Sequence, residues 1–215
     1  MTSKDYRSED ITVNFDPGRC IHSAECIHSL PEVFDVEKRP WIQPGESDPE
    51  TVAEVVMRCP TGALQFARKD DGDEEPIPEE NVVTIAKDGP LYVRGDVEIK
   101  EHDGTTFLED TRIALCRCGE SQNKPFCDNS HKNSGFRDAG SLDQSSYVES
   151  SASGGRLEVK LTPNGPLFVK GEFEIRGSEG EPGYRESKAA LCRCGHSGGK
   201  PFCDGSHGEM GWRDD

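Results

Sequence analysis

The sequence predicts an α+β protein in which an N-terminal α/β segment is followed by two copies of a small β-rich unit. The spacing Cys-x-Cys-x8-Cys-x3-His occurs twice, at Cys116–His131 and at Cys192–His207, 76 residues apart. The flanking sequence repeats with the same offset, since GPLYVRGDVEIK from Gly89 matches GPLFVKGEFEIR from Gly165. A repeat at one fixed offset indicates two copies of one structural unit.

The composition limits the size of any core and the kinds of partner. Only 32% of the residues are hydrophobic and 7% aromatic, which favours small domains with thin cores. Small domains need additional cross-links, and a bound metal is one of them. The formal net charge of −16 would repel nucleic acid and anionic membrane surfaces. We therefore expect no nucleic acid and no membrane as partners, whereas a basic protein surface would suit this acidic chain.

The nine cysteines favour metal binding over disulfides. The chain starts MTSKDYRSED, without the apolar run of a signal peptide, and we find no stretch long enough to span a bilayer. We expect a cytoplasmic location, where thiols stay reduced. An odd number of cysteines cannot pair completely within one chain, but nine divide into three triplets. The triplets are Cys20, Cys26 and Cys59; Cys116, Cys118 and Cys127; and Cys192, Cys194 and Cys203.

The first triplet lies in a segment with its own pattern of strands and helices. Residues 10–15 alternate apolar and polar side chains, as a short strand does, and a helical turn is expected after Ser23. A clearer helix with an apolar face of valines follows Ser47 or Asp48, either of which can cap it. Residues 61–66 then predict a turn and a closing strand.

Each copy of the repeated unit is predicted to hold three short strands. A Gly-Pro turn separates the first two strands, and the third leads into the cysteines. Such a unit has little stability alone, so we expect both copies to share one sheet with approximate two-fold symmetry. The expected strands are residues 82–86, 91–93 and 112–115 in the first copy and residues 157–161, 167–169 and 189–191 in the second.

Two polar segments divide the chain. The first, DDGDEEPIPEE, is acidic, and the second, SLDQSSYVESSASGG, is rich in serine. The predicted organisation is a first domain at residues 1–69, an acidic linker at 70–80, the first repeat at 81–138, a Ser/Gly-rich linker at 139–155 and the second repeat at 156–215.

The spacing within each repeated motif suits a metal site built from two pairs of ligands. In an extended strand, residues two apart point to the same side, so the Cys-x-Cys pair can hold one metal atom. Asp128 and Asp204 are good helix caps, and a helical turn after them would bring the histidine onto the same face as the third cysteine. Two pairs suit a 2Fe-2S cluster, but three cysteines and a histidine are also a zinc ligand set. The candidate ligands are Cys116, Cys118, Cys127 and His131, and Cys192, Cys194, Cys203 and His207.

The complete motif resembles that of the CDGSH iron–sulfur proteins, the mitoNEET-like group. The second copy matches it throughout, including Ser197 and the run CDGSH at residues 203–207. The first copy shares the motif serine, Ser121, but carries Asn129 in place of the glycine. Asparagine tolerates the left-handed conformation, so we expect no loss of function there.

This resemblance implies a 2Fe-2S cluster in each motif, held by three thiolates and one histidine. It also implies an intrachain pseudo-dimer that resembles the homodimers of the family. By the same resemblance, Lys87 would lie near the cluster histidine of the facing unit, whereas Pro163 stands at that position in the second repeat.

Residues 10–68 resemble a divergent branch of the single-cluster bacterial ferredoxins. The matching runs are CIHSAEC from Cys20, LPEVFD from Leu30, RPW from Arg39 and RCPTGAL from Arg58. An ordinary four-iron ferredoxin has a cysteine where Ser23 stands here. The resemblance therefore implies a ferredoxin-like domain with a 3Fe-4S cluster, or with a 4Fe-4S cluster whose fourth ligand is not a thiolate. Ser23 and His22 are the local candidates for that ligand, and a domain that has lost its cluster is the alternative.

These observations predict a non-enzymatic iron–sulfur protein that passes single electrons to a redox partner protein as a monomer. The alternatives are cluster storage, cluster transfer or redox and pH sensing, and a zinc-stapled interaction module. A histidine ligand raises the potential and makes a site acid-labile, so His131→Cys or His207→Cys is expected to lower the potential and slow acid loss. Trp41 and Trp212 follow no stacking pattern in the sequence.

Overall fold

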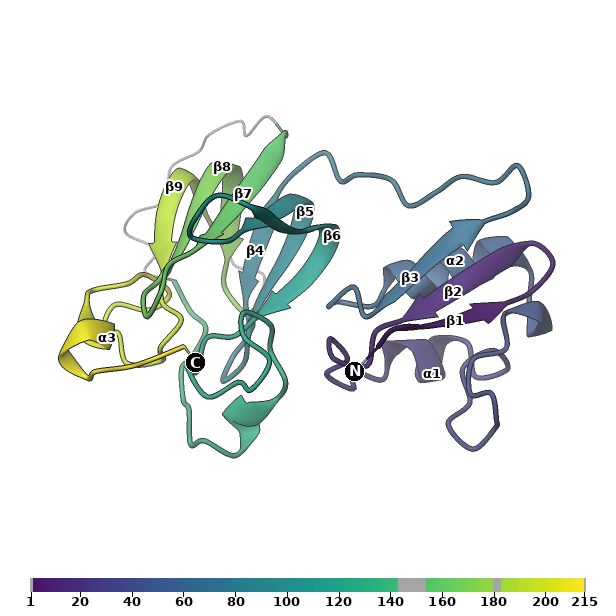
Figure 1. Cartoon of the computed structure of the whole chain (residues 1–215), viewed down its shortest axis with the longest axis horizontal. Helices are drawn as coiled ribbons and strands as arrows, with labels where there is room; N and C mark the ends of the chain where they lie inside the picture. Colours follow the sequence, from purple (N-terminus) through teal and green to yellow (C-terminus); the bar gives the residue numbers. More distant parts are fainter. Residues whose placement is uncertain (1, 143–153, 180–182, 215) are drawn as a thin grey trace. The chain divides into compact units, whose positions relative to one another are not determined.

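The structure, a computed structural model, describes residues 2–142, 154–179 and 183–214 and divides into two compact units, residues 1–76 and 77–215 (Figure 1). Most of the regular structure is β, with a few short helices. Part of the predicted linker at 139–155 lies outside the described residues. Among the described residues, no helix has the length and apolar character needed to cross a membrane.

The first unit is built on an antiparallel sheet with the strand order β1-β2-β3. Its strands are β1 (Lys4–Arg7), β2 (Ile11–Phe15) and β3 (Leu64–Arg68). The sequence predicted β2 and β3, while β1 was missed because its short run KDYR buries only Tyr6. The first and last segments of the unit therefore pair with the same central strand, which brings the chain around Cys59 back beside the chain before Cys20.

Two α-helices complete this unit. Helix α1 (Glu25–Ser29) starts just after Ser23, as predicted, and helix α2 (Pro49–Met57) is capped by Asp48, whose side chain accepts a hydrogen bond from the Thr51 amide. A short 3-10 helix, Pro44–Glu46, precedes α2. The predicted valine face of α2 is buried in a core that also takes side chains from all three strands and from the loops. This core supports the loops that carry the three N-terminal cysteines.

The second unit contains a six-stranded sheet to which both repeats contribute. The first repeat supplies β4 (Val82–Ile85), β5 (Leu91–Lys100) and β6 (Thr106–Leu115). The second supplies β7 (Arg156–Leu161), β8 (Leu167–Arg176) and β9 (Tyr184–Leu191). The predicted strands are all present, but four of them extend well beyond the predicted ends, because β5 with β6, and β8 with β9, form long antiparallel ribbons.

The repeats exchange strands in a reciprocal manner. Strand β4 of the first repeat pairs in parallel with β8 of the second, and β7 of the second pairs in parallel with β5 of the first. The register is also reciprocal: Val83 pairs with Ile175, and the residues equivalent to them by the repeat offset, Val159 and Ile99, pair with each other. The two repeats therefore satisfy each other's strand edges.

Each long strand changes partner at a bulge. Register shifts lie between Arg94 and Val97 in β5 and between Lys170 and Phe173 in β8, each next to a glycine with positive φ. A bulge bends the strand and increases its twist. The first half of each strand can therefore pair within its own repeat while the second half pairs with the other repeat.

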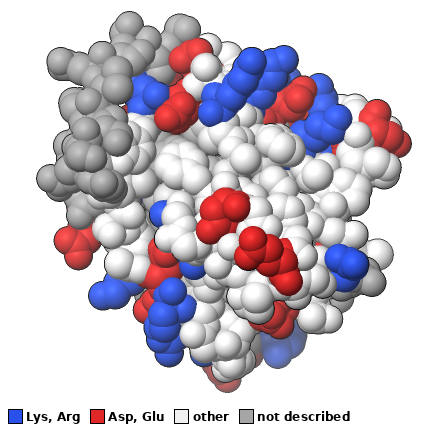
Figure 2. Space-filling view, turned by 90° about the vertical axis from the view of Figure 1, so that its left-hand side faces the viewer, with Lys and Arg blue, Asp and Glu red and all other residues white. Residues whose placement is uncertain are grey.

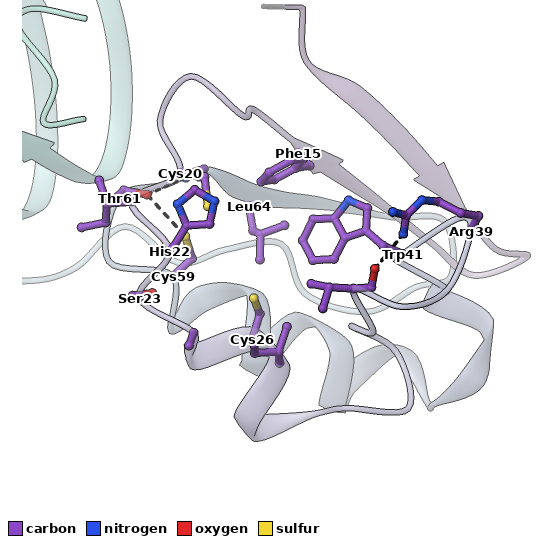
Figure 3. A pocket seen from close by; sticks show the side chains of 15 residues that line it. Phe15, Cys20, His22, Ser23, Cys26, Arg39, Trp41, Cys59, Thr61 and Leu64 are labelled. Atoms are coloured by element: carbon purple, nitrogen blue, oxygen red, sulfur yellow. Dashed lines mark hydrogen bonds between the residues drawn. The ribbon is translucent and has the colours of Figure 1, made fainter. Parts of the chain in front are cut away.

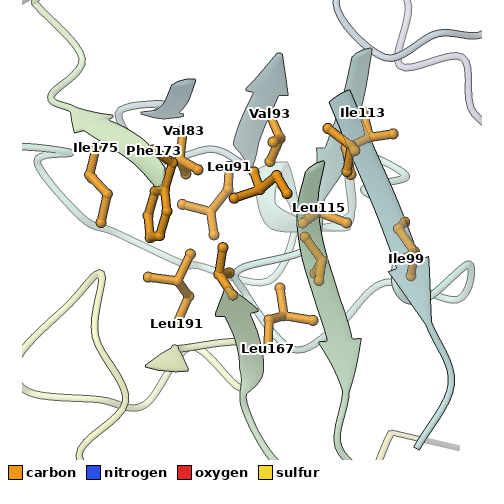
Figure 4. Packing of buried hydrophobic residues seen from close by; sticks show 14 of the residues in the cluster. Val83, Leu91, Val93, Ile99, Ile113, Leu115, Leu167, Phe173, Ile175 and Leu191 are labelled. Carbon is orange, nitrogen blue, oxygen red and sulfur yellow. The ribbon is translucent and has the colours of Figure 1, made fainter. Parts of the chain in front are cut away.

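One hydrophobic core fills the second unit. It contains fully buried side chains from both repeats, among them Val83, Leu91 and Ile113 of the first and Leu167, Phe173 and Leu191 of the second (Figure 4). Because each repeat supplies only part of this core, neither has a complete core of its own. At one end of the core, β6 ends at Leu115 and β9 ends at Leu191, and each leads directly into a cysteine pair.

Candidate metal centres

The two repeated motifs have the same local structure. After Leu115 the chain makes a loop and returns antiparallel to the end of β6, so that the Cys116 amide donates to the Pro125 carbonyl and the Cys127 amide donates to the Ala114 carbonyl. The second motif repeats both bonds, from Cys192 to Pro201 and from Cys203 to Ala190. The third cysteine is thereby fixed beside the strand that carries the first two.

The motif serines hold this loop from inside. The Ser121 hydroxyl donates to the Phe126 carbonyl at 2.7 Å and accepts from the Asn123 amide at 3.0 Å. Ser197 makes the equivalent bonds to the Phe202 carbonyl and from the Gly199 amide. Both serines are buried, so their polar groups are satisfied entirely within the loop.

The motif aspartates tie the loop to the helical turn that carries the histidine. One Asp128 carboxylate oxygen accepts from the Gln122 amide and the other from the Ser130 amide, and Asp204 does the same with Gly198 and Ser206. The prediction that these aspartates are the helix caps is wrong by one residue. The cap positions are Asn129 and Gly205, both left-handed, and they precede the 3-10 helix Ser130–Lys132 and helix α3 (Ser206–Glu209).

The four predicted ligands of each motif are arranged in two close pairs. The two sulfur atoms of Cys116 and Cys118 lie 3.7 Å apart, and so do those of Cys192 and Cys194. The Cys127 sulfur lies 3.4 Å from Nδ1 of His131, and the Cys203 sulfur lies 3.4 Å from Nδ1 of His207. Two thiolates on one tetrahedral metal at about 2.3 Å are roughly 3.8 Å apart, so each pair has the spacing of two ligands on one metal atom.

The ionisation of these groups also suits metal binding. The contact between the Cys116 and Cys118 sulfurs lowers the pKa of Cys116 to about 6 and raises that of Cys118. The same contact lowers the pKa of Cys192 and raises that of Cys194. Each pair thus shares one proton between two sulfurs, and a cation placed between them would replace it.

The first histidine is held in the form that binds metal. Burial, followed by the positive charges of Lys132 and Arg117, lowers the pKa of His131, so its imidazole is neutral at neutral pH. Burial likewise raises the pKa of Cys127 to about 11. His131 and Cys127 are both buried, whereas His207 and Cys203 of the second motif are half-buried.

The three N-terminal cysteines line one cavity of about 470 Å³ (Figure 3). Cys20 comes from the loop after β2, Cys26 from α1 and Cys59 from the end of α2. Burial raises the pKa of Cys20 and of Cys26, the latter to about 11, and the nearby Cys59 sulfur adds to both shifts. Three thiols around one cavity are a donor set that fits an iron–sulfur cluster.

The proposed fourth ligands also lie at this cavity. His22 and Ser23 line it and are exposed to solvent. The two neighbours of Ser23 in the sequence, His22 and Ala24, both have positive φ. Phe15 and Trp41 close the apolar side, with ring centroids 5.0 Å apart. Trp41 therefore has aromatic neighbours although the sequence shows no stacking pattern, because those neighbours come from distant segments.

Several residues around the repeated motifs were missed in the sequence. Arg117 lies between the two cysteines with a fully buried side chain, and it donates to the Ala86 and Gly89 carbonyls and to Asp138. Phe136 packs on the cysteine pair of the first motif. The equivalent residues of the second motif are Arg193, Asp214 and Trp212. The repeated runs GFRD and GWRD, which share the offset of the motifs, were the signal that could have found them.

Lys87 is exposed, and its predicted place near the facing histidine stays a prediction. In the part of the chain that the structure describes, no group of three or more His, Cys, Asp or Glu side chains is placed to hold one metal ion. The close contacts are pairs, two in each repeated motif.

Comparison with known families decides what these sites belong to. The family described as "Iron-binding zinc finger CDGSH type" matches twice, at residues 88–132 and 164–208, and "Divergent 4Fe-4S mono-cluster" matches residues 6–69. This chain belongs to the CDGSH iron-binding proteins and carries a divergent mono-cluster 4Fe-4S domain at its N-terminus. Both family assignments and their order agree with the resemblances found in the sequence.

Curated relatives of this CDGSH protein match part of it. The chain is 39% identical over 64 residues to "Uncharacterized protein YjdI" of Escherichia coli strain K12, an alignment that covers 30% of this chain and 84% of the relative. The YjdI protein of Escherichia coli O157:H7 matches with the same figures. No solved structure matches the chain significantly.

Proposed function

We propose that this chain is an electron-transfer protein that carries two 2Fe-2S clusters and a third cluster of the 3Fe-4S or 4Fe-4S type. The observation that carries the proposal is the division of each CDGSH ligand set into two pairs, with sulfur–sulfur distances of 3.7 Å and sulfur–nitrogen distances of 3.4 Å. One pair would bind each of two iron atoms. Such a cluster, when bound, accepts and releases one electron at a time.

The chain's own residues define what such a cluster would experience. Cys116, Cys118 and Cys127 are almost completely buried, which excludes water from their sulfur atoms. Backbone amides donate to the sulfurs, as Asn129 does to Cys127 at 3.4 Å and His196 does to Cys194 at 3.5 Å. Hydrogen bonds to sulfur and the replacement of one thiolate by an imidazole both raise a cluster potential.

The N-terminal unit is proposed to be a ferredoxin-like domain with its cluster held by Cys20, Cys26 and Cys59. The support is that all three sulfurs line one cavity, together with both candidate fourth ligands. The Ser23 hydroxyl oxygen and the His22 ring nitrogens are donors that iron accepts, so we propose that one of these two residues is the fourth ligand. The alternative is a domain that binds no cluster, and metal analysis distinguishes the two.

The two repeats are proposed to form an intrachain pseudo-dimer, so that the protein is a monomer. We propose that it resides in a reducing compartment such as the cytoplasm. The reciprocal strand pairing and the shared core support this arrangement. We further propose that the protein is not an enzyme and that its partner is a redox protein. The face drawn in Figure 2 carries Lys and Arg as well as Asp and Glu side chains among uncharged residues, so a partner there would meet both signs of charge.

Metal analysis of anaerobically purified protein tests the proposal. We expect four iron and four sulfide per chain from the CDGSH sites, plus three or four iron and four sulfide from the N-terminal site. EPR spectra should show reversible one-electron reduction. Zinc without sulfide would contradict the proposal and indicate a zinc-stapled interaction module. Iron clusters that cannot be reduced or reoxidised by any reductant or acceptor would contradict a role in electron transfer.

The histidine ligands provide a second test. His131→Cys and His207→Cys should each lower the potential of one cluster and slow its loss in acid, because a thiolate adds negative charge and removes a basic nitrogen. Potentiometric titration followed by EPR measures the first effect, and visible absorbance at mildly acidic pH measures the second. His28→Cys, at an exposed position outside the cavity lining, is the control. Unchanged acid loss in both variants would overturn the ligand assignment.

Cluster transfer is the second candidate, favoured by the difference in burial between the two motifs. Cys203 and His207 are half-buried, whereas their counterparts Cys127 and His131 are buried. A more exposed ligand pair is more accessible to an acceptor. Transfer to an apo-ferredoxin should then come from the second site first, which is measured with chains in which one motif is disabled at a time.

A further inference from the structure

The two CDGSH loops touch each other directly at their cysteine pairs. A Cβ atom on Gly119 would lie 2.4 Å from the Cys194 carbonyl oxygen, and a Cβ atom on Gly195 would lie 2.6 Å from the Cys118 carbonyl oxygen. Both glycines also have positive φ, at 85° and 83°. The residue after each Cys-x-Cys pair must therefore be glycine, because the backbone of the other pair occupies the space of a side chain.

Trp212 extends this contact from one site to the other. Its indole packs on Cys192 and Cys194 of the second site, and only 9% of its surface is exposed. Its Nε1 donates a hydrogen bond of 3.2 Å to the carbonyl of Gly119, which directly follows Cys118 of the first site. One side chain thus contacts the ligands of the second site and the loop that ends the first pair.

The ring is fixed from several sides. The Arg193 guanidinium lies 5.1 Å from the ring centroid and is itself bound to Asp214 at 2.5 Å. Lys124 of the first repeat approaches the ring at 5.9 Å. A buried indole in contact with two cations has little freedom to change its position.

The first repeat lacks this bridge. Phe136 stands at the position equivalent to Trp212, packs on Cys116 and Cys118, and lies 5.1 Å below the Arg117 guanidinium. A phenyl ring has no N–H group, so it cannot bind the opposite loop in the same way. In both repeats the aromatic residue after the motif therefore packs on the cysteine pair of its own motif. In the second repeat it also binds the loop of the other motif.

We propose that Trp212 is a positioning residue that couples the two CDGSH sites, so that each loop is held in its metal-binding shape by the other. This inference rests on one part of the proposed function, namely that both motifs bind metal. It requires that an empty first site loosens the second, and by thermodynamic reciprocity that an empty second site loosens the first. A coupling of about 1 kcal/mol or more corresponds to at least fivefold in retention.

The test follows loss of the second cluster to a chelator in the full chain. Cys127→Ser disables the first site at the ligand pair remote from the contact, so the remaining CDGSH absorbance belongs to the second site. We expect the second cluster to be lost at least about fivefold faster in this variant than in the intact chain. Trp212→Phe should accelerate the loss similarly, while the double variant should show no further acceleration, because one coupling is removed twice.

Phe136→Leu is the matched control, because the Phe136 ring packs on the cysteine pair and the arginine of its own motif and has no hydrogen-bonding group for the opposite loop, so its loss should leave the contact between the loops intact. Gly119→Ala is a second, independent variant: its methyl group would displace Cys194, so it should accelerate loss from the second site even if Trp212→Phe folds poorly. Equal loss of the second cluster in Cys127→Ser and in the intact chain would overturn the coupling. A protein without iron would instead overturn the proposed function, so the two failures are distinguishable.

Discussion

Arg117 and Arg193 each occupy the middle of a Cys-x-Cys pair and are buried there with their charge. Each guanidinium forms one ion pair, with Asp138 or Asp214, and donates to two carbonyls of the turn before the second strand of its repeat. Alternation in a strand end places the arginine opposite to the cysteines, so it fixes the direction in which both sulfurs point. The arginine therefore serves the metal site without touching the metal.

Replacement of Arg117 by lysine should destabilise the second unit by on the order of 2 kcal/mol, because an ammonium cannot reproduce the planar fork that reaches three partners. Denaturant unfolding of the metal-loaded protein measures the change. Arg137→Lys is the matched control, since Arg137 is exposed and donates to a neighbouring carbonyl. Equal stability of the two variants would show that the fork is not needed.

Asn129 has φ of 73°, in the left-handed region, as predicted from its alignment with Gly205. Asn129→Val should weaken the first site and cost about 1 to 2 kcal/mol, because a β-branched side chain clashes in this conformation. Asn129→Gly should keep its iron and its stability. Iron content and thermal unfolding of the two variants check this, and a valine variant as stable as the glycine variant would contradict it.

The ligand residues could be predicted because their spacing is local: two residues in a strand, four residues in a helical turn. The positions of Arg117, Phe136 and Trp212 could not, since their side-chain partners lie 18 or more positions away in sequence or in the other repeat. Trp212 in particular had no local pattern, and only its contact with Gly119, 93 residues earlier, reveals its position. Local periodicity carries no information about such contacts.

At the scale of the elements, Asn81 connects the start of β4 to the second repeat. Its side-chain amide donates to the Gly155 and Glu172 carbonyls, and its side-chain oxygen accepts from the Asp96 amide next to the bulge in β5. Asn81 is 2% exposed, so these bonds are shielded from water. The residue therefore holds together three strands at the point where the long strands change partner.

Asn81→Ala should lower the free energy of unfolding of the second unit by about 1 to 3 kcal/mol, because buried backbone groups lose their partners. Thermal unfolding monitored by far-UV circular dichroism measures the effect. Asn133→Ala, at an exposed position beyond the first motif, should have little effect. An unchanged melting temperature for Asn81→Ala would show that water replaces the lost bonds.

The predicted starts of β5 and β8 are correct and their predicted ends are not, whereas for β6 and β9 the ends are correct and the starts lie earlier than predicted. Residues 91–93 and 167–169 were predicted from alternation, but β5 and β8 continue to Lys100 and Arg176. The bulges at Gly95 and Gly171 interrupt the alternation and so hide the second half of each strand. Strand β1 was hidden for a related reason, because a four-residue edge strand with one buried side chain has no readable period.

At the scale of the whole molecule, each of the two units has its own core. The first core takes all its buried residues from positions before 65, and the second takes all of its residues from positions after 82. The shared sheet was predicted from the repeat, but its parallel pairs, β4 with β8 and β5 with β7, were not. Pairing partners depend on which edges remain free after each repeat has folded, and the sequence of one repeat does not contain that information.

Residues 1–76 and 77–215 should therefore fold when produced separately. We expect the longer fragment to keep the melting temperature and the visible spectrum of the CDGSH sites, because its core and its eight candidate ligands are complete. Circular dichroism and iron analysis of both fragments check this. A longer fragment that unfolds or loses iron would contradict the independence of the two cores.

The reciprocal pairing of β4 with β8 and of β5 with β7 also changes the role of the peptide connection between the repeats. Since each repeat completes the other's sheet, a gene split between codons 142 and 154 would encode two polypeptides that form an obligate heterodimer. The intact connection then raises the effective concentration of each half for the other. It also keeps the ratio of the two halves at one to one, so that each half can carry a different residue at equivalent positions, as Phe136 and Trp212 show.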